Sequence, residues 1–553
     1  MSSVIKAHEL AKNQRDISVA EFFEKNRHLL GFDNPRKALL TTIKEAVDNA
    51  FDACEEADFL PEIEVQIIKM SDSVYRIIVA DNGPGIVKKQ IPPIFGKLLY
   101  GSKFHSLKQQ RGQQGIGISA AALYSQLTTG KGIRIISRIH ETEPAHYYVI
   151  KVDTRKNKPE IIEEGVVEWE KNHGTVIEMD IEAEYKKGDI SVDEYLKETA
   201  IVNPHSTIIY TNPELKQEVY IRATEQKPKK CRSIKPHPYG VELGRMMNMM
   251  KWTSSKTIQS FLMDEFSRVG ATSAKKILEE AAILARAKPK SLTREQGESL
   301  IKAIKKISII SPPTDCIAPI GEELVIKGLR KEVNADFYTS VTRSPSVYRG
   351  NPFLIECGIA YGGDLDADGS VKIMRFANRV PLLYQKGGCA ITDSVIKTNW
   401  KSYNLRQASG SKPQGPVLIM VHMASVWVPF TSEAKEAIAH YPEIIKEIKL
   451  ALQEAGRKLG IFLRKKAKAG KELKKFEYLK KYVPHVAEAL KELIGLSDYE
   501  EEQLAKALVE VLEGERSITK NPGDLSEDIP DNSSEEEARD DIPDKELVQR
   551  RLR

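Results

Sequence analysis

Residues 44–53 read KEAVDNAFDA, and they combine an apolar stripe with an equally regular polar row. The polar residues follow the i, i+3, i+4, i+7 spacing that places side chains on one face of a helix. They are Glu45, Asp48, Asn49 and Asp52. The stretch therefore predicts an amphipathic helix. Its polar face would ordinarily be solvated, and the alternative is a polar ligand bound against it.

Length and composition limit the classes of protein to which the chain can belong. Its 553 residues exceed a single hydrophobic core and predict about three or four domains. The sequence holds no run of about 18 apolar residues, and its first residues lack the apolar segment of a signal peptide. The five cysteines are never spaced CxxC, so we expect free thiols and no zinc site. We expect a cytoplasmic protein without a membrane span.

The net charge of +5 is unevenly distributed along the chain. Residues 521–553 carry 11 acidic and 5 basic side chains, whereas residues 446–481 carry 13 basic and 4 acidic ones on a helical pattern. A basic helix of this kind is either solvated or in contact with phosphates. Charge alone does not decide between these alternatives.

The order of predicted helices and strands divides the chain into five parts. Residues 1–228 mix helices with strands such as VYRIIVADN and predict an α+β domain in which helices cover a sheet. Residues 229–307 lack strands and predict a compact helical insert. Strands return in residues 308–480, a second α/β unit, and long helices are expected from Thr431 onward, including those of residues 481–515. The acidic residues 516–553 predict a disordered tail.

An aspartate and two glycines follow the strand VYRIIVA, in the sequence DNGPGI at residues 81–86. Asp81 places a carboxylate at the end of the strand, and Gly83 and Gly85 allow the backbone to approach a flat ligand closely. An Asn-Gly pair is also typical of a tight turn, which is the structural alternative.

A longer glycine-rich segment, GKLLYGSKFHSLKQQRGQQGIGIS at residues 96–119, leads directly into a predicted helix. Backbone amides at a helix N-terminus favour phosphate groups, and Ser102, Lys103 and Arg111 are available for polar and cationic contacts. A flexible surface loop is the alternative. The chain has no GxxxxGK[ST] sequence, which excludes a Walker-type phosphate loop.

The order of these three motifs resembles the Bergerat, or GHKL, ATPase superfamily, which includes gyrases, heat-shock chaperones, histidine kinases and mismatch-repair clamps. Within that superfamily, RGQQGIGISAAALYSQLTTGK (residues 111–131) and TAIVNPHSTI (residues 199–208) resemble the B subunits of archaeal topoisomerase VI, a type IIB DNA topoisomerase. The resemblance extends to about residue 510. It implies a GHKL domain, a helix-two-turn-helix insert, a transducer and C-terminal helices.

The resemblance also implies ATP and Mg²⁺ as cofactors and gives roles to the motif residues. Glu45 would act as general base, and Asn49 would ligate the Mg²⁺ that bridges the phosphates. Asp81 would accept a hydrogen bond from the adenine amino group, and Thr175 would lie close to it. The other residues expected around the nucleotide are Gly83, Gly85, Ser102, Lys103, Arg111, Gly112, Gln113, Gln114, Gly115, Ile116, Gly117 and Ile118.

In the second α/β unit the resemblance implies a transducer lysine that reaches the γ-phosphate. Lys435, in VPFTSEAKEAIA, follows a predicted strand and matches this lysine best, so it is expected to be catalytic. Trp400, Lys401 and Tyr403, in TNWKSYNL, match a family signature in the lever that couples nucleotide state to DNA. A buried aromatic pair is the structural alternative for that signature.

Two further segments bear on possible ligands. EYKKGDISVDEY, residues 184–195, keeps only Lys186 and Lys187 of a basic loop found in relatives, which leaves DNA contact at this loop open. DLDADG, residues 364–369, begins like a calcium-binding EF-hand loop, but Arg375 stands where a bidentate Glu is required. We expect a hairpin turn there.

The resemblance thus implies the ATP-hydrolysing subunit of a nucleoid-associated type IIB topoisomerase. The A subunit of topoisomerase VI would bind the C-terminal helices in an A2B2 heterotetramer and break the DNA, while ATP dimerises the ATPase domains around a second duplex. The alternatives are a GHKL chaperone or mismatch-repair clamp, and a DNA-binding scaffold with a degenerate ATP site. Glu45 and Lys435 argue against the scaffold, because DNA binding alone needs neither. The roles of Asp48 and Asp52 stay open.

Overall fold

The structure, a computed structural model, describes residues 10–12, 14, 16–102, 106–112, 115–432 and 434–516. The chain divides into two compact units, of which the first ends at Gly460 and the second begins at Ile461. The expected site residues Lys103, Gln113 and Gln114 lie outside the described residues, as does the expected disordered tail from residue 517 on. In the part that the structure describes, no helix is both long and apolar enough to cross a membrane.

The N-terminal part of the chain is built on an eight-stranded sheet. Its strands are β1 (Glu62–Lys69), β2 (Val74–Asp81), β3 (Ile133–Arg138), β4 (Ala145–Asp153), β5 (Lys158–Val167), β6 (Gly174–Glu182), β7 (Thr207–Thr211) and β8 (Gln217–Tyr220). They lie in the order β5-β4-β3-β6-β2-β1-β7-β8, and only β1 and β7 pair in parallel. Along β1, Ile63, Val65 and Ile67 are buried and Glu62 and Glu64 are exposed, so one face carries the core.

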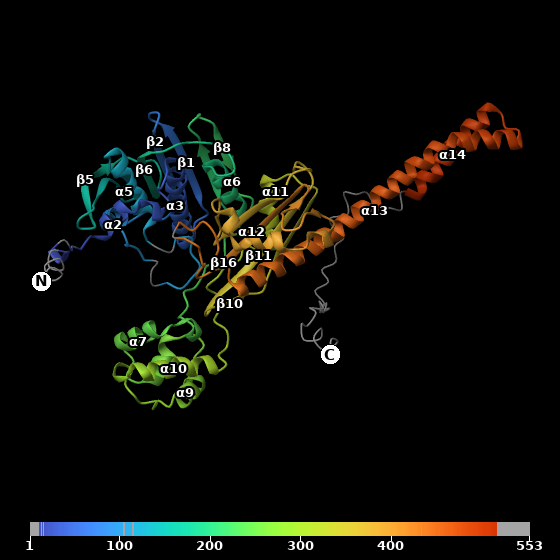
Figure 1. Ribbon diagram of the computed structural model, residues 1–553. Helices are drawn as coiled ribbons and strands as arrows, with labels where there is room; N and C mark the ends of the chain where they lie inside the picture. The colour runs from blue at the N-terminus through green and yellow to red at the C-terminus, as the bar shows by residue number, and fades with distance from the viewer. Residues whose placement is uncertain are drawn as a thin grey trace. The chain divides into compact units, whose positions relative to one another are not determined.

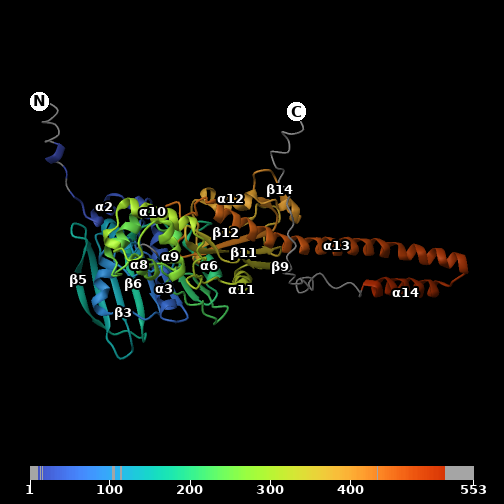
Figure 2. The same ribbon diagram turned by 90° about the horizontal axis from the view of Figure 1, so that it is seen from below.

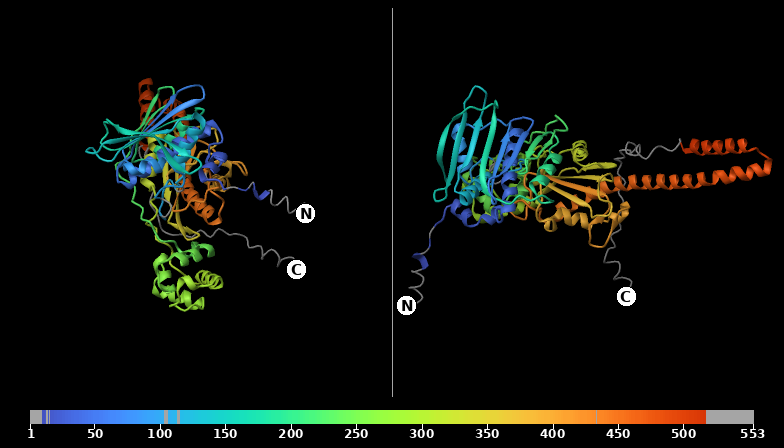
Figure 3. Two further views of the ribbon diagram at one scale, coloured as in Figure 1. Left: turned by 90° about the vertical axis from the view of Figure 1, so that its left-hand side faces the viewer. Right: turned by 90° about the horizontal axis from the view of Figure 1, so that it is seen from above.

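Helices cover that buried face of the sheet (Figures 1 and 3). They include α2 (Val19–Lys25), α3 (Pro35–Glu56), α4 (Ile91–Gly96), α5 (Gly117–Thr129) and α6 (Val192–Val202). Helix α3 begins after Asn34, whose side chain accepts a hydrogen bond from the amide of Lys37 at 2.8 Å. Ile43 and Val47 of α3 are fully buried, which confirms the amphipathic helix predicted around residues 44–53.

Four α-helices form a group with a core of its own inside the predicted insert (Figure 1). They are α7 (Leu243–Trp252), α8 (Ile258–Glu265), α9 (Ala271–Glu280) and α10 (Arg294–Lys306). Met246, Phe261 and Leu300 are among the fully buried side chains of this core. Capping boxes begin α8 at Thr257 and α10 at Thr293, which stabilises these short helices at their first turns.

A second sheet follows the insert. Its segment comprises α11 (Glu322–Glu332), β9 (Phe337–Thr342), β10 (Ser346–Tyr348), β11 (Asn351–Tyr361), β12 (Lys372–Ala377), β13 (Val380–Pro381), α12 (Ala390–Lys397), β14 (Arg406–Gln407), β15 (Pro413–Gln414) and β16 (Val417–Ser425). The main path is β10-β11-β16-β12-β13, with β9 also paired to β11. Strands β11 and β16 are buried along nearly their whole length because both faces are covered, and Figure 2 shows α11 and α12 flanking this sheet.

The structure corrects the prediction for residues 364–369. These residues connect β11 to β12, but β16 lies between those two strands, so the segment is a crossover turn and not the expected hairpin. The periodic pattern of β11 and β12 indicates which side chains are buried, but it does not show that both strands pair with β16 and not with each other.

The C-terminal helices are α13 (Pro442–Ile494) and α14 (Asp498–Arg516). The sequence predicts helix from Thr431 onward, but the helix begins only at Pro442. In between, the amide of Thr431 donates to the carbonyl of Ala437 at 2.9 Å and closes a loop that contains Lys435. Helix α13 also runs through the predicted boundary at residue 480 without a break.

Candidate functional site

A cavity of about 720 Å³ lies between α3, the N-terminus of α5, strands β2 and β6, and segments of the second sheet region. Its wall combines residues that are far apart in the sequence. The residues singled out from the sequence that line it are Glu45, Asn49, Asp52, Asp81, Gly85, Ser102, Gly112, Gly115, Ile116, Gly117, Ile118, Thr175 and Lys435. The polar face of α3 therefore borders a cavity.

The carboxylate of Glu45 and the ammonium of Lys435 face each other in this cavity. The two groups are 3.9 Å apart, and the Glu45 side chain keeps 17% of its surface exposed. Lys435 Nζ also donates to the carbonyl oxygen of Arg111 at 3.3 Å. At Gly117, the first residue of α5, an added Cβ would lie 1.7 Å from Glu45 Oε2. A larger residue at position 117 would therefore require the Glu45 side chain to move from this position.

A buried acceptor lies at the end of β2. Asp81 Oδ1 accepts hydrogen bonds from the amides of Gly83 at 2.8 Å and Thr175 at 3.3 Å, and Thr175 is its register partner on β6. Burial raises the pKa of Asp81 to about 6, although these amides oppose the shift. Gly85 has φ +69°, and a Cβ there would lie 2.1 Å from the carbonyl oxygen of Arg138. Asp81, Gly85 and Thr175 all line the cavity, where the carboxylate of Asp81 can accept a hydrogen bond from a ligand.

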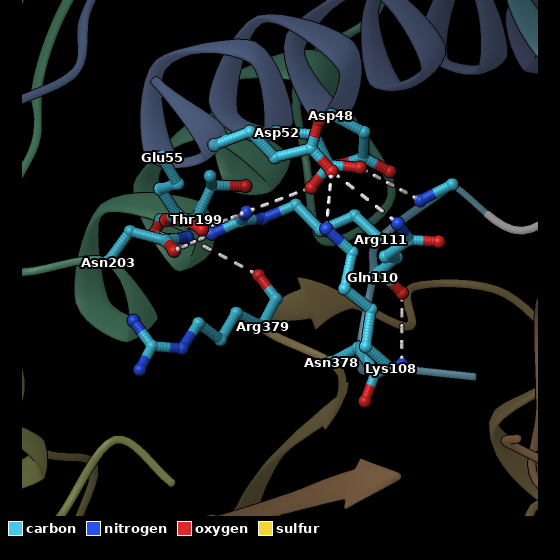
Figure 4. A network of polar contacts seen from close by, with 12 residues as sticks. Asp48, Asp52, Glu55, Lys108, Gln110, Arg111, Thr199, Asn203, Asn378 and Arg379 are labelled. Carbon is cyan, nitrogen blue, oxygen red and sulfur yellow. Dashed lines mark hydrogen bonds and ion pairs between the residues drawn. The ribbon is translucent and has the colours of Figure 1, made fainter. Parts of the chain in front are cut away.

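The side chain of Arg111, which the resemblance places near the phosphates, contacts protein side chains (Figure 4). Its guanidinium pairs with both oxygens of Glu55 at 2.7 Å, contacts Asp52 at 3.1 Å and donates to Asn203 at 2.6 Å. It also lies 4.8 Å from the ring centre of Phe51. Burial disfavours the charge of Glu55, but the guanidinium outweighs this and holds the pKa of that carboxyl well below its usual value. In this arrangement Arg111 anchors the base of the glycine-rich loop to α3 and α6.

The same network reaches the second sheet region (Figure 4). Asn378 Nδ2 donates to the carbonyl of Gln110 at 3.0 Å, and Asn203 Nδ2 donates to the carbonyl of Arg379 at 3.3 Å. Asn378 and Arg379 both have positive φ and form the turn between β12 and β13. The glycine-rich loop is therefore hydrogen-bonded to both α/β parts of the chain.

Asp48 and Asp52, whose roles the sequence left open, contact other protein groups. Asp48 is buried and accepts a hydrogen bond from the hydroxyl of Tyr195 at 3.1 Å, and burial raises its pKa to about 6. Asp52 contacts Arg111 and accepts from the amide of Gly112 at 3.4 Å. Both carboxylates thus hold neighbouring segments in place around the cavity.

Several cavity residues were not identified from the sequence. They are Lys37, Lys44, Tyr195, Tyr384 and Glu436, among others. Lys44 precedes Glu45 in the KEAVDNAFDA stretch, so its position was a usable signal; burial lowers its pKa. Tyr384 belongs to no quoted motif, whereas Glu436 directly follows Lys435 in VPFTSEAKEAIA; both reach the cavity because the second sheet region packs beside it.

The site can hold a nucleotide and act on it. Asp81 offers a buried acceptor, the glycine-rich loop leads into the N-terminus of α5, and Glu45 and Lys435 face each other in the same cavity. Among the described residues no three His, Cys, Asp or Glu side chains gather as a metal site. A magnesium ion, which prefers one or two protein oxygens together with phosphate oxygens, fits the amide of Asn49 beside a bound triphosphate. This fold and site define a GHKL-type ATPase joined to a transducer.

Comparison with known proteins identifies the family. Residues 34–182 match the family described as histidine kinase-, DNA gyrase B-, and HSP90-like ATPase, and residues 312–475 match the topoisomerase VI B subunit transducer. The chain is 51% identical over 485 residues to the B subunit of type 2 DNA topoisomerase 6 from Methanococcoides burtonii, covering 88% of this chain and 78% of that protein. It is 46% identical over 515 residues to the corresponding protein of Archaeoglobus fulgidus, covering 93% and 85%. The chain therefore belongs to the family of type 2 DNA topoisomerase 6 B subunits.

Proposed function

We propose that this chain is the ATP-driven gate of a type IIB DNA topoisomerase. It binds and hydrolyses ATP and uses the cycle to direct one DNA duplex through a double-strand break made by the A subunit, which relaxes supercoiled DNA. The observation that carries this proposal is the approach of Lys435, from the second α/β part, to within 3.9 Å of Glu45 in the nucleotide cavity of the first.

The residues around the cavity divide the chemical work. Glu45 takes a proton from the attacking water, and the ammonium of Lys435 binds the terminal phosphate. Asn49 holds the magnesium ion, which neutralises phosphate charge when it is bound. Asp81 and Thr175 hold the adenine, and the backbone amides of Gly112, Gly115, Ile116, Gly117 and Ile118 surround the phosphates.

Loss of the terminal phosphate removes a partner of Lys435. Because Lys435 belongs to the transducer, hydrolysis changes the contacts of the transducer with the nucleotide cavity. The Trp-Lys-x-Tyr signature lies where it could carry such a change. Trp400 is fully buried, and Tyr403 packs against α13, where a Cβ on Gly456 would lie 2.6 Å from its ring. We propose that this contact transmits the transducer state to α13.

The partners follow from the same proposal. The A subunit binds the C-terminal helices from about residue 481 to residue 515 in an A2B2 complex. Lys187, in the loop that keeps only Lys186 and Lys187 of the basic residues, forms an exposed ion pair with Glu214 at 2.7 Å. DNA contact at this loop stays open.

Relaxation of a supercoiled plasmid tests the proposal. The chain should relax it only with the A subunit and ATP, and ATP hydrolysis should be stimulated by DNA. Glu45→Ala should keep nucleotide affinity and lower turnover by at least about 100-fold, because a general base contributes that much. Relaxation without the A subunit, stimulation by unfolded protein in place of DNA, or wild-type turnover in Glu45→Ala would each contradict the proposal.

A further inference from the structure

The loop that carries Lys435 has an unusual backbone. Lys435 has φ +54°, in the left-handed region that residues other than glycine rarely adopt. Its amide donates to the carbonyl of Ser432 at 3.1 Å, and its neighbour Glu436 is buried. A strained residue of this kind persists when its surroundings hold it in place. The contacts of Glu436 show which groups do so.

Glu436 is held from two directions. Lys37 Nζ, in the first turn of α3, lies 2.6 Å from Glu436 Oε1, and these side chains keep only 15% and 7% of their surface exposed. Gln385 Nε2 donates to Glu436 Oε2 at 2.5 Å. The other end of the same amide, Gln385 Oε1, accepts from the hydroxyl of Thr431 at 3.3 Å. Gln385 therefore spans the loop, and Lys37 ties it to the ATPase domain.

The two ionic contacts lie on one helix. Lys37 and Glu45 are separated by about two turns of α3, roughly 12 Å along its axis. Lys37 pairs with Glu436, and Glu45 faces Lys435. The basic Lys435 of the loop thus faces an acidic residue of α3, and the acidic Glu436 next to it pairs with a basic residue of α3. A single contact would let the loop pivot, whereas two separated contacts set both its position and its direction.

We propose that Lys37, Glu436 and Gln385 form a latch that positions Lys435 for ATP hydrolysis. The Lys37–Glu436–Gln385 latch rests on the proposed role of Lys435 at the terminal phosphate. Its members are positioning residues, since they act on the nucleotide through the lysine.

Gln385, which donates to Glu436, is held in place by other residues of the transducer. Arg375 is fully buried in β12, and its Nη2 donates to the carbonyls of Leu382 at 2.5 Å and Tyr384 at 2.8 Å. This holds the segment that ends in Gln385. The Tyr384 ring also lies 5.4 Å from Lys37 Nζ, a cation–π distance. Movement of the transducer strands would therefore move Gln385 and carry Glu436 with it.

Lys37 stays charged at neutral pH. Burial lowers its pKa, but the ion pairs with Glu436 and Asp33 outweigh burial and place the pKa above the usual value. Asp33 lies 3.0 Å from Lys37 Nζ, one turn away along the chain, and its side chain is 40% exposed. It offers a matched control, because its removal leaves the contact between the domains intact.

Steady-state ATP hydrolysis by the complex with the A subunit and DNA tests the latch. Lys37→Met and Glu436→Gln should each lower kcat by about tenfold or more, because a misplaced catalytic group costs rate, while KM for ATP changes less than about threefold. Lys37→Arg should restore most of kcat because it keeps the ion pair. The double variant Lys37→Met with Glu436→Gln should be no slower than the slower single variant, since both changes break one contact.

Asp33→Asn should keep kcat within about twofold of the wild type. Thermal unfolding of each variant shows whether a lower kcat reflects misfolding or a displaced Lys435. Rescue of kcat by Lys37→Arg would also exclude misfolding as the cause. Wild-type kcat in both single variants, multiplied losses in the double variant, or failure of Lys37→Arg to rescue would each overturn the latch while leaving the proposed function intact. Absence of ATP hydrolysis by the wild-type complex would instead overturn the proposed function and the latch together.

Discussion

At the scale of single residues, Asp81 is a buried carboxylate whose unfavourable burial makes it a strong acceptor for a ligand's hydrogen bond. Its carboxylate is surrounded by the sheet and accepts two backbone amides, yet burial still raises its pKa to about 6. At pH 7 it is therefore mostly ionised and accepts strong hydrogen bonds, but it lies close to neutralisation. The amino group of a base that enters the cavity would donate a hydrogen bond to the Asp81 carboxylate and stabilise its ionised form.

This makes nucleotide affinity depend on pH. As the pH falls from 7 to 5, through the pKa of about 6, Asp81 takes up a proton and affinity for ATP should fall by about tenfold. Asp81→Asn should bind more weakly at pH 7 and show a flatter profile. Titration calorimetry from pH 5 to 8 measures the ATP affinity of the wild type and of Asp81→Asn. Protonation of the nucleotide itself affects both proteins equally, so the difference between their profiles reports on Asp81. Parallel profiles for the two proteins would exclude Asp81 as the group responsible.

At the scale of elements, Arg111 connects the glycine-rich loop to α3 and α6. A phosphate-binding arginine would be free before ATP arrives, whereas this one already contacts Glu55, Asp52 and Asn203. The segment after it leads into α5, where Gly117 touches Glu45. The base of the glycine-rich loop at Arg111 is therefore held to α3 and α6 by ion pairs and a hydrogen bond.

Arg111→Ala should destabilise the protein even without nucleotide. It leaves the buried carboxylate of Asp52 and the partly buried carboxylate of Glu55 without their cation, and loss of one partner of a buried ion pair typically costs about 3–5 kcal/mol of the free energy of unfolding. Denaturant unfolding of the nucleotide-free chain measures this loss. Arg294→Ala, at an exposed pair in the insert, is the control and should cost less than about 1 kcal/mol. An unchanged free energy of unfolding in Arg111→Ala, with weaker ATP binding, would favour a phosphate-binding role.

At the scale of the whole molecule, the cavity receives residues from both α/β parts. Lys435 and the Lys37–Glu436–Gln385 latch join them on one side, and the contact of Asn378 with Gln110 joins them on the other. Two such contacts make the nucleotide state and the relative position of these parts mutually dependent.

Nucleotide should therefore change the assembly of the chain. We expect the isolated chain to be monomeric without nucleotide and to dimerise through its ATPase domain with a non-hydrolysable ATP analogue. Glu45→Ala should also accumulate dimers with ATP itself, because it binds without turnover. Light scattering of the eluted protein gives the mass in each state, and Asp81→Asn provides a control that binds poorly. An unchanged mass with saturating analogue would count against the ATP-driven gate.

The sequence by itself determined the features that depend on neighbours along the chain. The amphipathic pattern of α3, the glycines at positions 85 and 117 and the order of the motifs reflect helical periodicity and close backbone contacts, which local residues encode. Through their resemblance to the GHKL superfamily, these motifs predicted the ATPase fold and indicated Glu45, Asn49 and Asp81 as its candidate residues.

Only the tertiary structure decided which side chains meet across the two α/β parts. The motif containing Arg111 suggested a phosphate contact, but Glu55 and Asn203 engage its guanidinium because α3 and α6 pack beside the loop. Lys37 and Glu436 belong to no shared pattern, since hundreds of residues separate them. Their contact depends on how one sheet packs against the other, and side-chain periodicity records only which face is buried, not what that face will touch.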